Sequence, residues 1–453
     1  MNATLATAAD AMQGVLHGAD IPYGGVSTDT RTVQAGELFF ALSGPNFDGA
    51  EFVSQAVAKG AVGAVVAEQT TDEIPQITVD DTRLALGRLG SAWRQQHDAT
   101  VIGVTGSNGK TTLKEMIAAC LAMSASTMAT AGNLNNDIGM PLMLLRIDAS
   151  HRYAVIEMGA NHGGEIAYLT SLALPDVVVI TNAGAAHLEG FGSLTGVAEG
   201  KGEILQDAKR PQCAVLNVDD DFYDYWRSLA DDTSVLSFGL SDHADVYASE
   251  IEAGRETTSF RLHLPDTSVA IELPLVGIHN VRNACAAAAV SCALNVSAAD
   301  IKTALESIVP VSGRLQPIAG LHGATLYDDS YNANPVSVIA AGEFVAALDG
   351  SGWMVLGEMG ELGEDAQTMH EQVGAALRDA GIARVFAVGE LSKATVAGFG
   401  EGGEWFASMD ELTAAVAADL NSQANVLVKG SRSARMERAV DAIRAAESMR
   451  REA

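Results

Sequence analysis

The stretch "GVTGSNGKTTLKE" (103–115) decides the fold class of this chain. It follows the apolar run "TVIGVTG" (100–106) and leads into "KTTLKEMIAACLAM" (110–123), where apolar residues recur at helical spacing. The pattern therefore predicts a strand, a glycine-rich turn and a helix. Gly103, Gly106 and Gly109 shape the turn and let the backbone approach a phosphate closely. The first turn of the helix offers unpaired N–H groups and a partial positive charge.

The turn also carries the side chains that a bound nucleotide needs. Lys110 can reach the β- and γ-phosphates, and the Thr111 hydroxyl can ligate Mg²⁺. Val104 stands where the common pattern G-x-x-x-x-G-K-[ST] begins with glycine, and it can end the strand instead. The alternative is a plain turn with a solvated lysine, but G-K-T-T between a strand and a helix favours the nucleotide. The expected nucleotide-binding residues are Gly106, Ser107, Asn108, Gly109, Lys110, Thr111 and Thr112.

The composition is that of an acidic, globular chain. Of its 453 residues, 48% are hydrophobic and 19% are charged, and the formal net charge is −29. This acidic surplus argues against nucleic-acid binding, because a phosphate backbone needs clustered Lys and Arg. The four cysteines lack C-x-x-C spacing and are expected to be reduced thiols. No apolar run approaches the ~20 residues of a membrane span, so we expect a cytoplasmic protein without a signal peptide.

The alternation of strands and helices predicts an α/β protein of three domains. Residues 1–98 read as a small α/β domain. Residues 99–310 read as a P-loop-type ATP-binding domain with a mostly parallel sheet, to which 246–276 adds antiparallel strands. Residues 311–453 read as a second open α/β sheet of Rossmann type.

Two further candidates stand at the ends of apolar strands in the central domain. Glu157 ends the run "YAVIE" (153–157), and His187 follows "VVVITNAG" (177–184). The carboxyl ends of parallel strands meet at one edge of a sheet, so both side chains should face the nucleotide. A carboxylate there suits Mg²⁺, and a histidine can ligate the metal or support a ligand. The alternatives are a solvated strand-end Glu and a structural His. Lys201, which we place early in a helix over 197–206, reads by itself as an exposed lysine.

Several segments together resemble the Mur ligase family, the ATP-dependent amino-acid ligases of peptidoglycan synthesis. Their order is that of the family, and they cover all three expected domains. They are "GVTGSNGKTT" (103–112), "GNLNND" (132–137), "VIEMGANHGGEIA" (155–167), "NAGAAHLEGFGS" (182–193), "AEGKGEIL" (198–205), "GIHNVRNACAA" (277–287), "GRLQ" (313–316) and "YDDSYNANPVS" (327–337).

The resemblance implies the reaction as well as the fold. "YNANPVS" (331–337) and "LGEMGELG" (356–363) are similar to the segments of those members that join D-alanyl-D-alanine to UDP-N-acetylmuramoyl-tripeptide. The implied reaction consumes ATP, passes through an acyl phosphate and is carried out by a monomer. The alternatives are a tripeptide-forming Mur ligase, which would carry D-x-A-H-x-P in place of D-S-Y-N-A-N-P, and a ligase like folylpolyglutamate synthase. A non-catalytic nucleotide-binding regulator is less favoured.

The resemblance also implies roles for individual residues toward ATP and metal. Lys110 and Thr111 hold phosphates, and Glu157 and His187 join Thr111 at the Mg²⁺ site. Lys201 matches a lysine that reacts with CO₂, and the resulting carbamate helps to hold a second Mg²⁺. Further nucleotide contacts are expected from His279, Asn280 and Asn283 at the adenine and from Arg314 and Asp328 of the C-terminal domain.

The remaining implied residues face the two substrates. Asn135 and Asn136 are expected near the muramoyl group and the metal, and Asn332 and Asn334 at the dipeptide carboxylate. Lys429, Arg432 and Arg435 form a basic cluster that either contacts substrate or is solvated. The expected UDP-sugar site consists of Ser27, Thr28, Asp29, Arg31, Asn46, Phe47, Asp48 and Gly49, for which a plain surface turn is the alternative.

Overall fold

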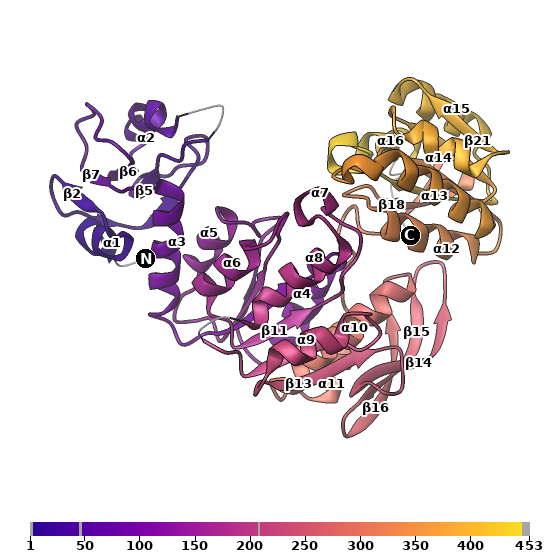
Figure 1. The fold of residues 1–453 in the computed structure, drawn as a ribbon, viewed down its shortest axis with the longest axis horizontal. Coiled ribbons are helices and arrows are strands. Elements are labelled where there is room, and N and C mark those ends of the chain that lie inside the picture. The colour runs from indigo at the N-terminus through magenta and orange to yellow at the C-terminus, as the bar shows by residue number, and fades with distance from the viewer. Residues whose placement is uncertain (1–2, 45–47, 207–208, 446–453) are drawn as a thin grey trace, which may run out of the picture.

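The computed structural model describes residues 3–44, 48–206 and 209–445 and contains three separate main sheets. Figure 1 shows the N-terminal and C-terminal units at opposite ends of a larger central unit. The α/β class and the mostly parallel sheets that the sequence predicted are confirmed.

The N-terminal unit is built on a five-stranded sheet in the order β2-β7-β6-β5-β4. Strands β4 to β7 run parallel, and β2 pairs antiparallel with β7. The sheet strands are β2 (Val15–His17), β4 (Gly25–Ser27), β5 (Glu37–Phe40), β6 (Gly63–Val66) and β7 (Gln76–Thr78). A separate antiparallel pair consists of β1 (Ala3–Thr4) and β3 (Pro22–Tyr23). The helices are α1 (Leu5–Met12), η1 (Gly49–Phe52), α2 (Val53–Ala58) and α3 (Thr82–Arg94).

The central unit is a nine-stranded sheet in the order β16-β15-β14-β13-β12-β11-β8-β10-β9. The first seven strands along the chain are parallel, and the antiparallel hairpin β15–β16 extends the sheet from β14, as the sequence predicted for 246–276. The strands are β8 (Thr100–Thr105), β9 (Thr127–Ala129), β10 (Tyr153–Glu157), β11 (Val177–Ile180), β12 (Cys213–Asn217), β13 (Ser234–Gly239), β14 (Val246–Ala253), β15 (Thr258–Leu264) and β16 (Thr267–Leu273).

Helices cover both faces of this central sheet. The helices are α4 (Lys110–Ala122), α5 (Gly139–Leu144), α6 (Glu165–Ala173), α7 (Leu188–Phe191), α8 (Leu194–Gly202), α9 (Tyr223–Ala230), α10 (Ile278–Ala293) and α11 (Ala298–Glu306). Alternate residues of β8 enter opposite cores. Ile102 and Val104 pack in the core with α4, α10 and α11, and Val101 packs in the core with α5, α6 and α9. Burial on both sides explains why these strands read as continuous apolar runs.

The C-terminal unit is a six-stranded sheet in the order β17-β18-β22-β19-β20-β21, parallel except for β17. Its strands are β17 (Gln316–Ala319), β18 (Thr325–Asp329), β19 (Ser351–Leu356), β20 (Arg384–Val388), β21 (Gly403–Phe406) and β22 (Ala424–Lys429). Its helices are α12 (Pro335–Ala346), α13 (Ala366–Asp379), α14 (Ser392–Phe399), α15 (Met409–Asp419) and α16 (Glu437–Ile443). In the described ranges, no helix combines the length and apolar character that a membrane crossing needs.

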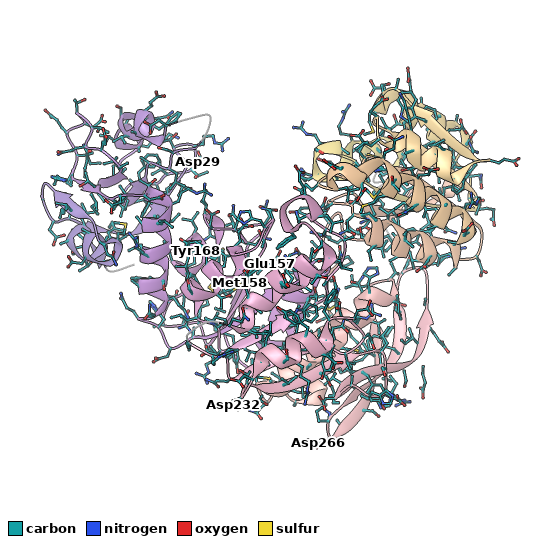
Figure 2. All side chains as sticks on the ribbon, viewed as in Figure 1. Asp29, Glu157, Met158, Tyr168, Asp232 and Asp266 are labelled. Atoms are coloured by element: carbon teal, nitrogen blue, oxygen red, sulfur yellow. The ribbon has the colours of Figure 1, made fainter. Side chains whose placement is uncertain are left out.

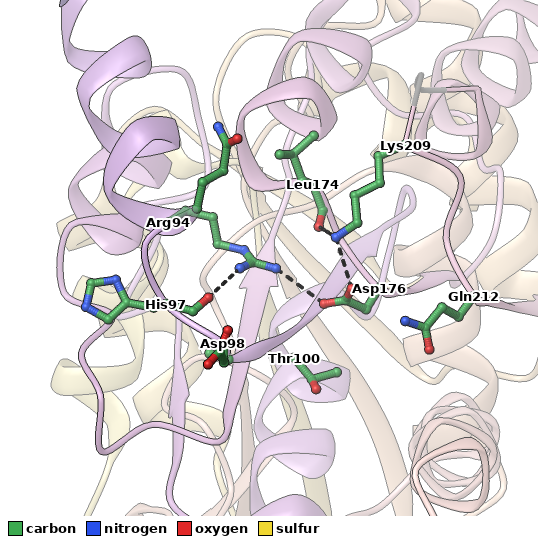
Figure 3. A pocket seen from close by; sticks show the side chains of 10 residues that line it. Arg94, His97, Asp98, Thr100, Leu174, Asp176, Lys209 and Gln212 are labelled. Carbon is green, nitrogen blue, oxygen red and sulfur yellow. Dashed lines mark hydrogen bonds and ion pairs between the residues drawn. The ribbon is translucent and has the colours of Figure 1, made fainter. Parts of the chain in front are cut away.

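A cavity of about 500 Å³ lies where α3 meets the amino ends of β8 and β11 (Figure 3). The charged side chains Arg94, Asp176 and Lys209 of its lining are already paired. Arg94 donates to the carbonyl oxygens of Ala173 (3.1 Å) and His97 (3.0 Å) and forms an ion pair with Asp176 (3.3 Å), which Lys209 also contacts at 3.0 Å. The pairing braces α3 of the N-terminal unit against the central sheet. This cavity is at the opposite end of the strands from the glycine-rich turn.

Candidate active site

The turn between β8 and α4 has a backbone that requires glycine. Gly106 has φ +139°, and a Cβ atom there would lie 1.9 Å from Thr181 Oγ1. Gly109 has φ +83°, and a Cβ atom there would lie 2.7 Å from Asn283 Oδ1. Both backbone conformations are unfavourable for side-chain-bearing residues, so the two glycines fit the turn sterically as well as conformationally.

The end of the neighbouring strand β11 fixes the shape of this turn. Asn182 accepts hydrogen bonds from Ser107 N through its carbonyl oxygen (2.9 Å) and from Asn108 N through its side chain (3.1 Å). Thr181 Oγ1 donates to the carbonyl oxygen of Asn108 at 2.7 Å. The turn is thus held rigidly beside the start of α4, as a preformed phosphate site requires.

Helix α4 begins directly after the turn with Lys110. Its N-cap, Gly109, has no side-chain capping bond among the described residues, so the N–H groups of the first helical turn remain available to an anion. Lys110 Nζ donates to the carbonyl oxygen of Gly106 at 2.7 Å and lies over the turn. Burial lowers the pKa of Lys110, the Glu157 carboxylate opposes that shift, and the Arg314 guanidinium adds to it. Two cations and a helix N-terminus therefore converge where the phosphates of a nucleotide would lie.

Glu157 ends β10 in the middle of the central unit (Figure 2) and is only 2% exposed. Its Oε1 accepts hydrogen bonds from Asn135 Nδ2 (2.7 Å) and Thr111 Oγ1 (3.4 Å). Its Oε2 is buried and has no hydrogen-bond partner within the described part of the chain. An orphaned buried carboxylate oxygen is costly, and a water, an ion or a ligand can serve as its partner. The alternative of a solvated strand-end Glu is therefore wrong.

Lys114 is a supporting residue that the sequence did not single out. It lies on α4 among the apolar positions Leu113, Met116 and Ile117, and its side chain is 1% exposed. Its Nζ donates to the carbonyl oxygen of Thr130 at 2.6 Å, and the Thr130 hydroxyl accepts the N–H of Glu157 at 2.9 Å. This chain of bonds ties the nucleotide helix to the position of Glu157. A lysine within the apolar face of a helix was the available signal.

Lys201 differs from its sequence interpretation in two respects. The Ser193 side chain caps α8 at Gly196 N (3.0 Å), so the helix begins at Leu194 and Lys201 lies at its end rather than early in it. Lys201 is also 1% exposed, which makes the exposed-lysine interpretation wrong. Its Nζ lies 4.8 Å from the Phe191 ring centroid and 3.4 Å from the carbonyl oxygen of Ala160. Burial, together with the charge of Lys110, lowers the pKa of Lys201 to about 7.

His187 follows β11 and faces the same group of residues. Burial lowers its pKa, the Glu361 carboxylate opposes that shift, and the positive charges of Lys110 and Lys201 add to it. The structure therefore gathers Lys110, Glu157, His187 and Lys201 around the carboxyl ends of β8, β10 and β11. Within the described ranges there is no group of three or more His, Cys, Asp or Glu placed to hold a metal ion. A metal here would depend on the Thr111 hydroxyl and on Lys201 as well.

The C-terminal unit reaches the glycine-rich turn through a hydrogen bond. Asn334 Nδ2 donates to Asn108 Oδ1 at 2.8 Å. The same Asn334 caps α12 by accepting Ser337 N at 2.9 Å, so the helix fixes its position. Arg314 lies 4.0 Å from the ring centroid of Tyr331, in the segment that leads to Asn334. These contacts bring a segment of the C-terminal sheet to the nucleotide turn, more than 200 residues away in sequence.

Comparisons with known proteins decide the family. Three family models match the chain, namely the Mur ligase family catalytic domain over 22–94, the Mur ligase middle domain over 104–291 and the Mur ligase glutamate ligase domain over 313–432. A curated relative from Escherichia coli (strain K12), named UDP-N-acetylmuramoyl-tripeptide–D-alanyl-D-alanine ligase, is 44% identical over 98% of each chain. This chain belongs to the Mur ligase family.

Other relatives within the Mur ligases agree with this membership. A protein of the same name from Haemophilus influenzae is 38% identical, over 91% of this chain and 92% of the relative. A crystal structure of MurF from Acinetobacter baumannii superposes with a TM-score of 0.92 at 38% identity, covering 97% of this chain and 98% of that one. MurF ligase from Thermotoga maritima in complex with ADP gives a TM-score of 0.83 at 27% identity, covering 92% and 96%.

The residues expected at the adenine of this Mur ligase lie at the start of α10. Asn283 Nδ2 donates to Asn280 Oδ1 at 3.3 Å, so the two side chains share a helix face as predicted. Asn280 Nδ2 donates to the carbonyl oxygen of Val276 at 2.8 Å. His279 stands beside them, and burial lowers its pKa to about 4. It is therefore neutral at physiological pH.

The residues expected at the UDP-sugar lie in two turns of the N-terminal unit. Ser27 ends β4, followed by Thr28, and Ser27 Oγ donates to the carbonyl oxygen of Asp29 at 3.1 Å. Asp29, labelled in Figure 2, pairs with Arg31 at 2.6 Å. Asp48 caps η1 by accepting Ala50 N at 3.0 Å. A Cβ atom on Gly49 would lie 2.2 Å from the carbonyl oxygen of Leu42. Asn46 and Phe47 lie outside the described residues.

Several other residues expected at the nucleotide or the substrates already have partners within the chain. Asn136 Oδ1 accepts Gly139 N at 2.8 Å at the start of α5. Asp328 Oδ1 accepts the Ser330 hydroxyl at 2.6 Å, and Asn332 is exposed. In the basic cluster, Lys429 is buried and pairs with Asp329 at 2.6 Å, Arg432 pairs with Glu437 at 3.2 Å, and Arg435 is exposed. The alternative that these cations are solvated is therefore wrong for Lys429.

Proposed function

We propose that this Mur ligase joins D-alanyl-D-alanine to UDP-N-acetylmuramoyl-tripeptide at the expense of ATP and so forms a peptide bond. The observation that carries the proposal is the hydrogen bond between Asn334 and Asn108. It brings the segment "YNANP" (331–335) against the phosphate-binding turn, where an incoming amine must meet an activated carboxyl group. The names of the two relatives, which match over more than nine-tenths of their length, support the same reaction.

The residues of the turn supply the binding of ATP. The N–H groups at the start of α4 and the Lys110 ammonium neutralise and orient the phosphates. Asn280 and Asn283, with His279, offer hydrogen-bonding groups for the adenine, and Arg314 and Asp328 are the proposed contacts from the C-terminal unit. The side chain of Asn283 lies beside Gly109, which supports a nucleotide running from α10 to the turn.

The orphaned Oε2 of Glu157 fits a Mg²⁺ ion. Glu157 and Thr111 would hold it, with His187 close by, and it would neutralise charge on the phosphates. Lys201 fits carbamate formation for a separate reason, because a buried lysine with a pKa of about 7 is partly a neutral amine. The ammonium would first lose one proton, and the neutral nitrogen would then bond to the carbon of CO₂ and release a second. The two losses convert a cation into a carbamate anion able to help hold a second Mg²⁺.

The reaction then proceeds by two displacements. The terminal carboxylate of the tripeptide attacks the γ-phosphorus of ATP, so that an acyl phosphate forms and ADP leaves. The amine of D-alanyl-D-alanine next attacks the acyl carbon, loses a proton and displaces phosphate. Lys110 holds the two negatively charged reactants of the first step in line. Because acyl phosphates hydrolyse, the three domains are expected to exclude water by closing around the substrates.

Substrate sites follow from the same arrangement. Asn332 and Asn334 are the proposed donors to the dipeptide carboxylate, and Asn135 and Asn136 lie near the muramoyl end. The UDP group would bind at the turns that contain Asp29 and Asp48.

We place the domain boundaries at 98/99 and 310/311, in agreement with β8 beginning at Thr100 and α11 ending at Glu306. We also infer a cytoplasmic monomer, because one chain supplies every proposed site and the proposed substrates include ATP.

The amine requirement tests this function. Purified protein with ATP and UDP-N-acetylmuramoyl-tripeptide should release phosphate rapidly only when D-alanyl-D-alanine is added. Lysine and meso-diaminopimelate, which lack the second carboxyl-terminal residue of the dipeptide, should give a rate near the background without an amine. Faster release with either single amino acid would assign the chain to another ligase of the family.

A further inference from the structure

A carboxylate from the C-terminal unit meets His187 of the central unit. Glu361 lies between β19 and the short helix η4 (Gly363–Asp365), and its Oε2 forms an ion-pair contact with His187 Nδ1. Nδ1 is buried and has no other polar partner in the described ranges of the chain. The backbones also meet, since Glu189 N approaches the carbonyl oxygen of Glu361 at 3.5 Å. Figure 1 shows α7, which begins after His187, facing the C-terminal unit.

Both members of this pair have an unfavourable backbone conformation. His187 has φ +54° and Glu361 has φ +60°. Residues other than glycine adopt this region in only a few per cent of cases, and such strain persists where the surroundings impose it, typically at functional sites. Two strained residues that face each other across a domain boundary indicate a contact that the fold maintains.

The segment carrying Glu361 is fixed to the C-terminal unit. His370 Nε2 accepts the N–H of Met359 at 3.0 Å, and the His370 side chain is itself buried on α13. Glu358 accepts the N–H of Leu391 through its side chain (2.7 Å) and that of Ser431 through its backbone (2.8 Å). Leu362, next to Glu361, is buried in the core of this unit. Glu361 therefore moves with the C-terminal unit and not with the central one.

The contact determines how the imidazole can act. A carboxylate at Nδ1 favours the tautomer that carries the proton on Nδ1, so the lone pair lies on Nε2. A lone pair on Nε2 can ligate a metal or accept a substrate proton. Without Glu361 the imidazole could rotate or change its tautomer.

We propose that Glu361 is a positioning residue for His187, and that this pair makes the correct form of the imidazole depend on docking of the C-terminal unit. The inference rests on the proposed ligase function, because it assigns His187 a task at that same site. The proposal gives Glu361, a residue of the segment "LGEMGELG" (356–363), a positioning role in the reaction.

Kinetics of Glu361→Ala test the pair first. We expect kcat to fall about 10- to 100-fold, as for other partners of a functional histidine, with KM for ATP nearly unchanged. Glu361→Gln, whose side-chain oxygen can still accept a hydrogen bond from Nδ1–H, should recover part of the loss. The matched control is Glu364→Ala, an exposed acid three residues away, which should behave as wild type. In a His187→Ala background, removing Glu361 should cost little more. Unchanged kcat in Glu361→Ala, or full additivity with His187→Ala, would overturn the proposal.

The ¹⁵N spectrum of the imidazoles tests the pair without any reaction. Among the 10 histidines, the His187 signals are those lost in His187→Asn. Well above the usual histidine pKa, wild type should show His187 protonated on Nδ1, and Glu361→Ala should shift it toward the other tautomer. An identical His187 spectrum in both proteins would refute the pair. A wild-type protein that shows the expected tautomer but releases no phosphate with the dipeptide would instead refute the ligase function.

Discussion

Lys201→Ala should lower the rate of dipeptide-dependent phosphate release by at least about a hundredfold while the protein stays folded. The reason is that the buried Lys201 amine is the proposed source of a negatively charged carbamate beside the phosphates. Removing it would take away oxygen ligands and negative charge from the proposed two-metal site. A lysine without a role in the reaction would lose little of this rate on truncation, whatever the effect on stability. Phosphate release under saturating substrates measures the effect, and thermal unfolding confirms that the variant is folded.

Added short carboxylic acids make this test specific for the carbamate. Acetate or formate can enter the space left by the Lys201 side chain and supply the missing oxygens, so activity should recover in part. Chloride at the same ionic strength should not restore it. The control is Lys393→Ala, an exposed lysine on α14, which should keep wild-type activity with or without acetate. Full activity of Lys201→Ala in plain buffer would eliminate the carbamate.

Lys110→Ala should reduce the rate by about 10²- to 10³-fold, the usual cost of removing one preorganised group that stabilises a charged transition state. Lys110 is the cation of the glycine-rich turn. The carboxylate and the γ-phosphate repel each other as they approach, and the Lys110 ammonium offsets that repulsion. The turn itself should survive, because Asn182 and Thr181 hold it independently of Lys110. Arginine is a poor substitute here, since its planar guanidinium does not replace a compact ammonium.

In Lys110→Ala, ATP binding should be weakened less than turnover. ATP affinity measured by calorimetry should fall less than the rate does, because the N–H groups of α4 still bind the phosphates. Lys302→Ala, on the outer helix α11, serves as the control in the same domain. A variant with unchanged turnover would show that the turn does not hold the reacting phosphates.

The sequence predicted the strands with continuous apolar runs better than the short or interrupted ones. β8, β10 and β11 were recognised because both faces of each strand are covered, which produces continuous apolar runs. β9 and β13 were missed. β9 has three residues, "TMA", which is too short for a pattern, and β13 reads "SVLSFG", where Ser237 interrupts the apolar run. Their strand conformation depends on pairing with β10 and β12, which local sequence does not contain.

The same distinction applies to the residues of the candidate site, some of which local sequence could locate and some of which it could not. Residues next to a strand end, such as Lys110 and Glu157, could be located from local pattern because parallel strands share an edge. Lys201 could not, because its burial comes from Phe191 and from neighbouring helices, and a lysine flanked by Glu199 and Glu203 looks solvated in sequence. The contacts of Asn334 with Asn108 and of Glu361 with His187 join separate domains, and single-sequence patterns carry no information about such pairs.

The mass of the nucleotide-linked product tests the central claim most directly. Protein, ATP, UDP-N-acetylmuramoyl-tripeptide and D-alanyl-D-alanine should yield one new compound whose mass is the sum of the tripeptide nucleotide and the dipeptide minus one water. One phosphate and one ADP should appear for each molecule formed, and omitting any substrate should abolish the product. Phosphate release without this joined compound, or a product that contains a single amino acid in place of the dipeptide, would contradict the account.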